Sequence, residues 1–144
     1  MSLWKQTPDI EQLNRMSHDT AASNLGIEIV EVGDDYIRAT MPVDARTRQP
    51  FGLLHGGASV LLAETLGSIA GVLTLDTSRE LAVGLEINAN HVRAVRDGVV
   101  TGTARPLHVG RTTQVWEIRI ETAKGDLACV SRITLAVVPR PPAQ

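Results

Sequence analysis

The fold is decided by one stretch, residues 57–75, which reads Gly57-Ala-Ser-Val-Leu-Leu-Ala-Glu-Thr-Leu-Gly-Ser-Ile-Ala-Gly-Val-Leu-Thr-Leu75. Its small residues recur three or four positions apart and therefore share one face of a helix; they are Ser59, Ala63, Gly67 and Ala70 or Gly71. Larger aliphatic residues fill the flanks of that face. A smooth face of this kind lets a helix backbone approach a sheet closely. The stretch therefore predicts a long helix buried against a sheet.

The rest of the chain predicts the sheet. Six strands are expected, at Leu25–Val32, Tyr36–Val43, Ala82–Val95, Gly98–Leu107, Thr113–Thr122 and Leu127–Val138. Short turn signals such as Lys124-Gly125-Asp126 separate the later strands, so neighbours should pair antiparallel. A short helix is expected at residues 9–16, with Asp9 as its N-cap. The simplest architecture is α+β: a long central helix wrapped by a curved six-stranded antiparallel sheet, as one domain over residues 1–138 with a flexible tail at 139–144.

Composition excludes several classes of protein. Of 144 residues, 43% are hydrophobic but only 3% are aromatic, and the formal net charge is −2. These values argue against an aromatic surface that stacks on nucleic acid and against a basic nucleic-acid-binding domain. The single cysteine, Cys129, excludes an intrachain disulfide, and its apolar neighbours predict a buried thiol, which fits a reducing cytoplasm. The first residues contain no apolar run long enough for a signal peptide.

Glu64 is the first candidate for chemistry. It is the only formally charged residue between Arg48 and Asp76, and it falls in the middle of the apolar helix. Because a carboxylate is costly in the lipid interior, its position argues against a membrane-spanning helix. No lysine or arginine stands one turn away to pair with it, although Ser68 follows four residues later on the same face. The carboxylate is therefore either functional or simply turned to solvent at the edge of the helix.

A second candidate is the tripeptide His55-Gly56-Gly57 at the start of the helix. Its glycines either make a tight turn or leave a backbone N–H bare for a developing oxyanion, helped by the helix dipole. His91 is expected on the apolar face of its strand together with Val83, Leu85, Ile87 and Ala89, either as a core residue or at the end of a pocket.

Other common chemistries have no support in the sequence. The four histidines show no metal-ligand spacing, and no acidic cluster accompanies them. The chain has no nucleophile elbow of the GxSxG type and no phosphate-binding glycine loop. No metal or cofactor is therefore expected.

Taken together, several motifs resemble the hotdog-fold acyl-CoA thioesterases. The stretch Gln49-Pro-Phe-Gly-Leu-Leu-His-Gly-Gly57, followed by Glu64 and Ser68, carries most of the resemblance. Met41–Asp44, Gly84–His91 and Gln114–Trp116 extend it to nearly the whole chain. The pattern is similar to the phenylacetate-pathway and 4-hydroxybenzoyl-CoA type, and closest to the 1,4-dihydroxy-2-naphthoyl-CoA and enterobactin proofreading thioesterases. The resemblance implies a thioester hydrolase acting on an aryl- or hydrophobic acyl-CoA.

The resemblance also implies roles for individual residues. Glu64 would attack the thioester carbonyl or activate water, the Gly56 N–H would polarise the carbonyl, and His55 and Gln49 would orient the thioester. Substrate contacts are implied at Ser68, Phe51, Gly84, His91, Val92, Arg93, Ala94, His108, Val109, Gly110, Arg111, Thr112 and Thr113. Phe51 is the one aromatic residue expected in the pocket, whose remaining wall should be aliphatic, with Leu53, Leu54 and Val60.

The resemblance further implies partners and alternatives. The thioester would be carried by CoA or by an acyl-carrier protein, and subunits would form dimers that pair into tetramers, with Glu64 opposite Gly56 and Gln49 of the neighbouring subunit. No nucleic acid or membrane partner is expected. Two alternatives on the same fold remain at this point: an acyl-CoA sensor without catalysis, and an enoyl-thioester hydratase or dehydratase using His55 and Glu64 for proton transfer.

Overall fold

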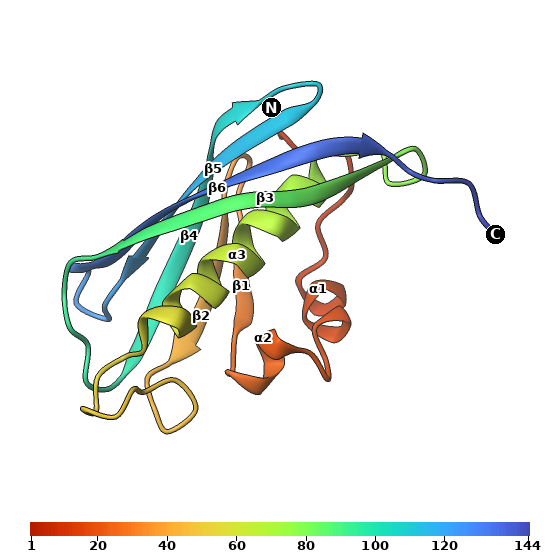
Figure 1. Ribbon diagram of the computed structural model, residues 1–144. Coiled ribbons are helices and arrows are strands. Elements are labelled where there is room, and N and C mark those ends of the chain that lie inside the picture. Colours follow the sequence, from red (N-terminus) through yellow and green to blue (C-terminus); the bar gives the residue numbers. More distant parts are fainter.

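The computed structural model describes residues 1–144 and contains one antiparallel sheet with a long helix against it (Figure 1). The strands are β1 (Glu28–Val32), β2 (Ile37–Pro42), β3 (Glu80–His91), β4 (Val99–Val109), β5 (Thr113–Glu121) and β6 (Leu127–Pro139). They lie in the order β1-β2-β4-β5-β6-β3, so β1 and β3 form the two edges. The α+β hotdog architecture and all six strands predicted from sequence are confirmed.

The long helix α3 (Gly56–Leu73) lies across the concave side of this sheet (Figure 1). Its small-residue stripe faces the strands, as predicted, because Ser59, Ala63, Gly67 and Ala70 are all buried. A Cβ added to Gly67 would come within 2.5 Å of the Ile133 side chain. The helix is long and apolar enough to cross a membrane, yet half of that stretch is buried inside the fold.

The C-terminal end of α3 is fixed by a buried hydrogen-bond network. Gln114 of β5 is fully buried; its amide donates to the hydroxyl of Thr74, the residue that follows the helix, at 2.8 Å, and its carbonyl accepts from the Trp116 indole at 2.9 Å. The Thr74 hydroxyl in turn donates to the Gly71 carbonyl at 2.7 Å. No buried side-chain polar atom in this network lacks a partner, so its hydrogen bonds offset the cost of burying these groups and fix the end of the helix.

Strand β3 departs from the predicted alternation. A bulge between Gly84 and Glu86 shifts its register against β6. Ala82 and Gly84 face the helix before the bulge, and Ile87 and Ala89 pack on the core after it. The prediction that Val83 and Leu85 share the inner face is therefore wrong, since an extra residue inverts the period-2 pattern and leaves Leu85 63% exposed.

The segment before β1 wraps beside the helix. It contains α1 (Ile10–Met16), capped by Asp9 as predicted, and the four-residue α2 (Ala21–Asn24), which is not apparent in the sequence. Asn14 ties α1 to β1 because its side chain both donates to and accepts from the backbone of Ile29. Further upstream, Trp4 stacks on Trp116 with ring centroids 6.1 Å apart and donates its indole N–H to the Gly33 carbonyl at 2.7 Å.

The thiol of Cys129 is buried in β6, as predicted. Burial raises its pKa, because the charged thiolate loses hydration in the core. The thiol is therefore a packing residue in this fold.

Candidate active site

The site begins at the N-terminus of α3, where backbone donors need partners. The Gly57 N–H donates to Nδ1 of His55 at 2.8 Å, and the N–H groups of Ala58 and Ser59 donate to the His55 carbonyl. The Gly56 N–H has no hydrogen-bond partner. One bare donor thus remains at the positive end of the helix dipole, which favours an oxyanion.

Both glycines at this point make room for an imidazole. A Cβ on Gly56 would lie 2.9 Å from Nε2 of His91, and a Cβ on Gly57 would lie 2.9 Å from Nδ1 of His55. The first contact places His91, at the end of β3, directly against the helix start. The second contact explains how His55 can cap the helix with its ring. Because its Nδ1 accepts that bond, the neutral His55 ring carries its proton on Nε2.

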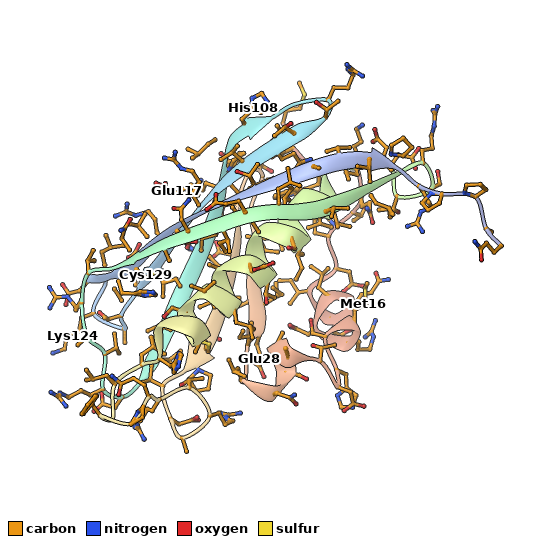
Figure 2. All side chains as sticks on the ribbon, in the orientation of Figure 1. Met16, Glu28, His108, Glu117, Lys124 and Cys129 are labelled. Carbon is orange, nitrogen blue, oxygen red and sulfur yellow. The ribbon has the colours of Figure 1, made fainter.

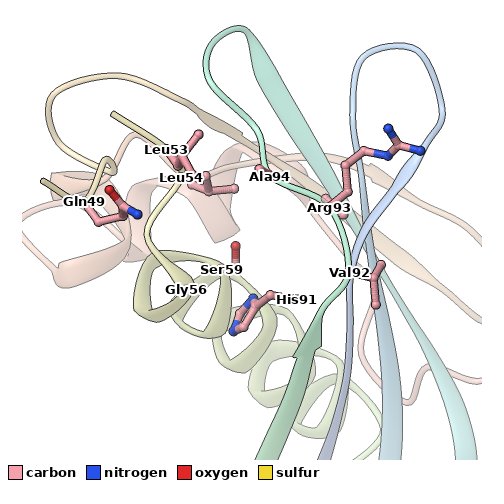
Figure 3. A pocket seen from close by; sticks show the side chains of 10 residues that line it. Gln49, Leu53, Leu54, Gly56, Ser59, His91, Val92, Arg93 and Ala94 are labelled. Carbon is pink, nitrogen blue, oxygen red and sulfur yellow. The ribbon is translucent and has the colours of Figure 1, made fainter. Parts of the chain in front are cut away.

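A cavity of about 370 Å³ opens beside this helix start (Figure 3). Its wall comes from the 49–59 segment, the end of β3, the connection after it and one residue of β6: Gln49, Leu53, Leu54, Gly56, Ser59, His91, Val92, Arg93, Ala94 and Ala128. Half of these residues are hydrophobic, and the others include Gln49, Ser59 and His91. An apolar cavity with a few convergent polar groups is the usual form of a small-molecule site.

The loop that carries Gln49 is held by its own polar groups. Asp44 accepts from the Arg46 guanidinium at 2.7 Å, and this pairing lowers the pKa of Asp44 to about 2. The buried Thr47 hydroxyl donates to the Pro42 carbonyl at 2.8 Å. Gln49 itself accepts the Phe51 N–H through its side-chain oxygen, so its amide NH₂ remains without a partner beside the cavity.

Glu64 lies on the exposed part of α3, next to the bulge of β3. Its carboxylate makes neither an ion pair nor a hydrogen bond, and one oxygen lies 3.6 Å from the position of a Cβ on Gly84. The bulge therefore presents a strand residue without a side chain to the carboxylate. Of the two interpretations left open by the sequence, the solvent-exposed position of Glu64 is confirmed. A catalytic role requires, in addition, a substrate that binds beside this carboxylate.

One chain does not bring Glu64 and Gly56 together on a single substrate atom. They are eight residues apart on one helix, or about 12 Å along its axis. An oxyanion donor must lie about 3 Å from the carbonyl oxygen, and a carboxylate that acts on the same carbonyl must touch the carbonyl carbon or lie one water molecule away from it. Glu64 is accordingly absent from the cavity beside Gly56 and lines a smaller one with Gly84, Leu85 and Glu86.

The remaining predicted residues are distributed between two ends of the molecule. His91, Val92, Arg93 and Ala94 line the cavity beside Gly56. The turn from His108 to Thr113 lies at the opposite end of the sheet, where Figure 2 labels His108. There Arg111 and Thr112 line a separate cavity of about 670 Å³ that also holds Lys5 and Arg79.

Two other predicted contacts lie outside the cavity beside Gly56. Phe51 is 84% exposed at the tip of the loop and does not line it. Ser68 lines a groove between α1 and α3 instead. Of the predicted aliphatic wall, Leu53 and Leu54 are present and Val60 is not.

The structure also adds cavity residues that the sequence analysis missed. The sequence predicts Ser59 only on the small packing face and Ala128 only in a strand, yet both line the cavity. No local signal marks them, because they reach the cavity only through the packing of α3 against β6. No group of three or more His, Cys, Asp or Glu side chains is close enough to hold a metal ion.

Comparison with known proteins identifies the family. Residues 51–129 match the family model of the thioesterase superfamily. The 1,4-dihydroxy-2-naphthoyl-CoA hydrolase of Escherichia coli is 52% identical over 136 residues, covering 94% of this chain and 99% of the relative. The proofreading thioesterase EntH of Cronobacter turicensis is 53% identical, covering 94% and 98% of the two chains.

A solved structure shares the whole fold. The crystal structure of a glutamine-to-alanine mutant of the thioesterase PA1618 from Pseudomonas aeruginosa superposes with a TM-score of 0.95 at 55% identity, covering 96% of this chain and all of that one. The resemblance read from the sequence motifs is thereby confirmed. This chain belongs to the thioesterase superfamily and has the superfamily's hotdog fold.

Proposed function

We propose that this protein hydrolyses the thioester of an aryl- or hydrophobic acyl-CoA, releasing the free acid and the CoA thiol. The observation that carries the proposal is the bare Gly56 N–H at the start of a buried helix whose only carboxylate, Glu64, has no structural partner. A thioester is already activated, so an oxyanion donor, a carboxylate and one water are sufficient for hydrolysis. The reaction therefore needs no metal or cofactor.

The proposed chemistry assigns one task to each group. The Gly56 N–H binds the carbonyl oxygen as negative charge develops, while Gln49 and the Nε2–H of His55 orient the thioester. Glu64 either removes a proton from the attacking water or attacks the carbonyl carbon itself. In the second case it forms a mixed anhydride, which water then hydrolyses to the free acid and the regenerated carboxylate. The C–S bond breaks, and the departing thiolate takes a proton to become free CoA.

The complete site is proposed to form between two copies of the chain. The 12 Å separation within one helix requires the Glu64 of one subunit to face the Gly56 and Gln49 of its neighbour. A homodimer is then the catalytic unit, and we propose that dimers pair into tetramers. The edge strand β3, which carries Gly84 and ends at His91, is available for this contact because only its β6 side is paired.

We propose that the segments containing Arg93 and Arg111 bind the thiol carrier. Arg93, beside Gly56, and Arg111, in the β4–β5 turn, are proposed to bind phosphates of CoA, because guanidinium groups suit phosphate oxygens. The same contacts suit the phosphopantetheine of an acyl-carrier protein. We place the enzyme in the cytoplasm, where its single buried thiol stays reduced.

The test is to replace Glu64 by alanine and by glutamine and to measure the release of free thiol from a benzoyl- or naphthoyl-CoA. Loss of a positioned carboxylate should lower kcat by roughly 10²–10⁴-fold with little change in the affinity for substrate. Glu86→Gln is the matched control, since Glu86 is an exposed carboxylate beside the same small cavity. An unchanged kcat in Glu64→Ala would refute the assignment.

The same assay separates the two alternatives. Addition of water to an enoyl thioester without release of thiol would identify a hydratase. Tight binding of acyl-CoA with no turnover by the unmodified protein would identify a sensor.

A further inference from the structure

A groove that the proposed chemistry does not use lies between α1 and α3. Its volume is about 250 Å³, and its floor and walls are mainly apolar: Leu13 and Met16 from α1, and Ile69, Val72 and Leu73 from α3. Met16 is 70% exposed and Val72 is 38% exposed, so two large apolar side chains border this groove without being buried by the chain itself. Exposed apolar surface that lines a concave site indicates a binding function.

The groove begins one helical turn from the proposed catalytic carboxylate. Ser68 lines it and follows Glu64 by four residues, which places it about 6 Å further along the axis and about 40° around it. Val72 continues the same direction by another turn, towards α1. Ser68 and Val72 therefore extend along α3 from Glu64 to the groove, and the Ser68 hydroxyl has no hydrogen-bond partner in the structure.

The charges of the groove decide what kind of group it can hold. Its polar residues are Gln6, Thr7, Asp9, Gln12 and Ser68, so its lining contains no lysine, arginine or histidine. Asp9 is occupied as the cap of α1, accepting the Gln12 N–H at 3.2 Å. Phosphates and carboxylates thus have no counter-charge here. The basic residues that suit the nucleotide end of CoA lie elsewhere, at Arg93 and Arg111.

We propose that this groove binds the acyl group of the thioester, and that Leu13 and Met16 of α1 set the size of acyl group accepted. The proposal rests on the function proposed above and adds the acyl subsite to it. An apolar cavity of about 150 Å³ accommodates one benzene ring, so about 250 Å³ accommodates a two-ring aryl group or a medium-length acyl chain. The N-terminal segment is then the specificity element of the enzyme, although it lies outside the segment that matches the family.

The test fills the groove from its exposed wall. Met16→Trp should lower kcat/KM for naphthoyl-CoA at least about tenfold, because the indole occupies the space of the second ring, and should leave acetyl-CoA within about twofold. Arg15→Trp is the matched control: Arg15 is the preceding residue, it is exposed, and it lines the opposite side of α1. Met16→Ala should shift the preference the other way, towards bulkier acyl groups.

Measurements of ligand affinity distinguish a failure of the proposed hydrolase from a failure of the proposed acyl groove. The affinities of non-hydrolysable thioether analogues with naphthyl and methyl groups are measured by calorimetry for the same variants. If the unmodified protein binds both analogues but releases no thiol from any thioester, the proposed hydrolase is wrong, while the loss of naphthyl affinity in Met16→Trp still supports the groove. If Met16→Trp and Arg15→Trp behave alike in both assays, the acyl groove is refuted and the hydrolase is unaffected.

Discussion

The single residues that matter most to the site are glycines, because each lies against a candidate functional group. Gly56 leaves space for His91 and Gly57 for the ring of His55, while a Cβ on Gly84 would just reach ordinary contact with the carboxylate of Glu64. None of the three has a positive φ, so their role is close approach and not backbone freedom. Each functional side chain is thus positioned by a neighbour that has no side chain.

Gly84 allows a graded test of this idea. A Cβ at this position would make an ordinary contact with Glu64 at 3.6 Å, so Gly84→Ala should keep most of the activity. Gly84→Val adds two methyl groups that must displace the carboxylate, and kcat should fall roughly 10- to 100-fold. Valine also favours a strand, so the melting temperature should not fall. Steady-state kinetics with thermal unfolding checks both points, and equal kcat in all three proteins would contradict the contact.

Much of this residue-level picture could be predicted from the sequence. The isolation of Glu64 and the glycines after His55 are visible in the pattern alone. The contact of His91 with Gly56 is not, because it joins the end of β3 to the start of α3, 35 positions earlier in the chain. For Phe51 the sequence predicts a contact that one chain does not make. The residue lies inside the motif, yet its side chain is exposed and does not line the cavity.

At the scale of the elements, α3 and its fit to the sheet determine the structure. The stripe of small residues was sufficient to predict both the helix and its burial, because close packing against a sheet requires that pattern. The bulge in β3 and the short helix α2 could not be predicted, since a bulge adds one residue without changing composition and a four-residue helix has no periodicity. The unpredicted bulge lies next to Glu64.

The stripe can be tested at Gly67, where helix propensity and packing oppose each other. Alanine favours a helix over glycine by about 1 kcal/mol, but a Cβ here would lie 2.5 Å from Ile133 in β6. Overpacking a core costs about 1–3 kcal/mol, so Gly67→Ala should lower the free energy of unfolding. Thr65→Ala, on the partly exposed side of the same helix, should leave it within about 0.5 kcal/mol. Urea denaturation measures both, and a stabilised Gly67→Ala would show that the helix does not pack closely at this point.

At the scale of the whole molecule, one chain does not bring the two proposed catalytic groups to one place. Its cavity beside Gly56 has the oxyanion donor but no carboxylate, and its carboxylate lies about 12 Å away along α3. The sequence predicts a site shared between subunits only through the family resemblance. The spacing of Gly56 and Glu64 along one helix does not indicate it, unless both groups are known to act on the same atom.

Mixing two impaired variants tests the shared site directly. Glu64→Ala and Gln49→Ala each spoil both sites of a homodimer, but a mixed dimer has one site with both mutations and one with neither. After subunit exchange of equal amounts, about half the dimers are mixed, so thiol release should recover to about one quarter of that of the unmodified enzyme. Each variant alone provides the baseline. No recovery after demonstrated exchange would place the site within one chain.

The stacked indoles of Trp4 and Trp116 give this protein an optical property. They are its only tryptophans, one on the N-terminal segment and one in the fully buried core, with their planes inclined by only 11°. Such a pair absorbs and emits ultraviolet light as a coupled unit. Detachment of the segment that carries α1 would separate the two indoles and shift their emission to longer wavelength. No other tryptophan in the protein would contribute to this signal. The fluorescence of the unlabelled protein therefore reports on the segment that borders the groove.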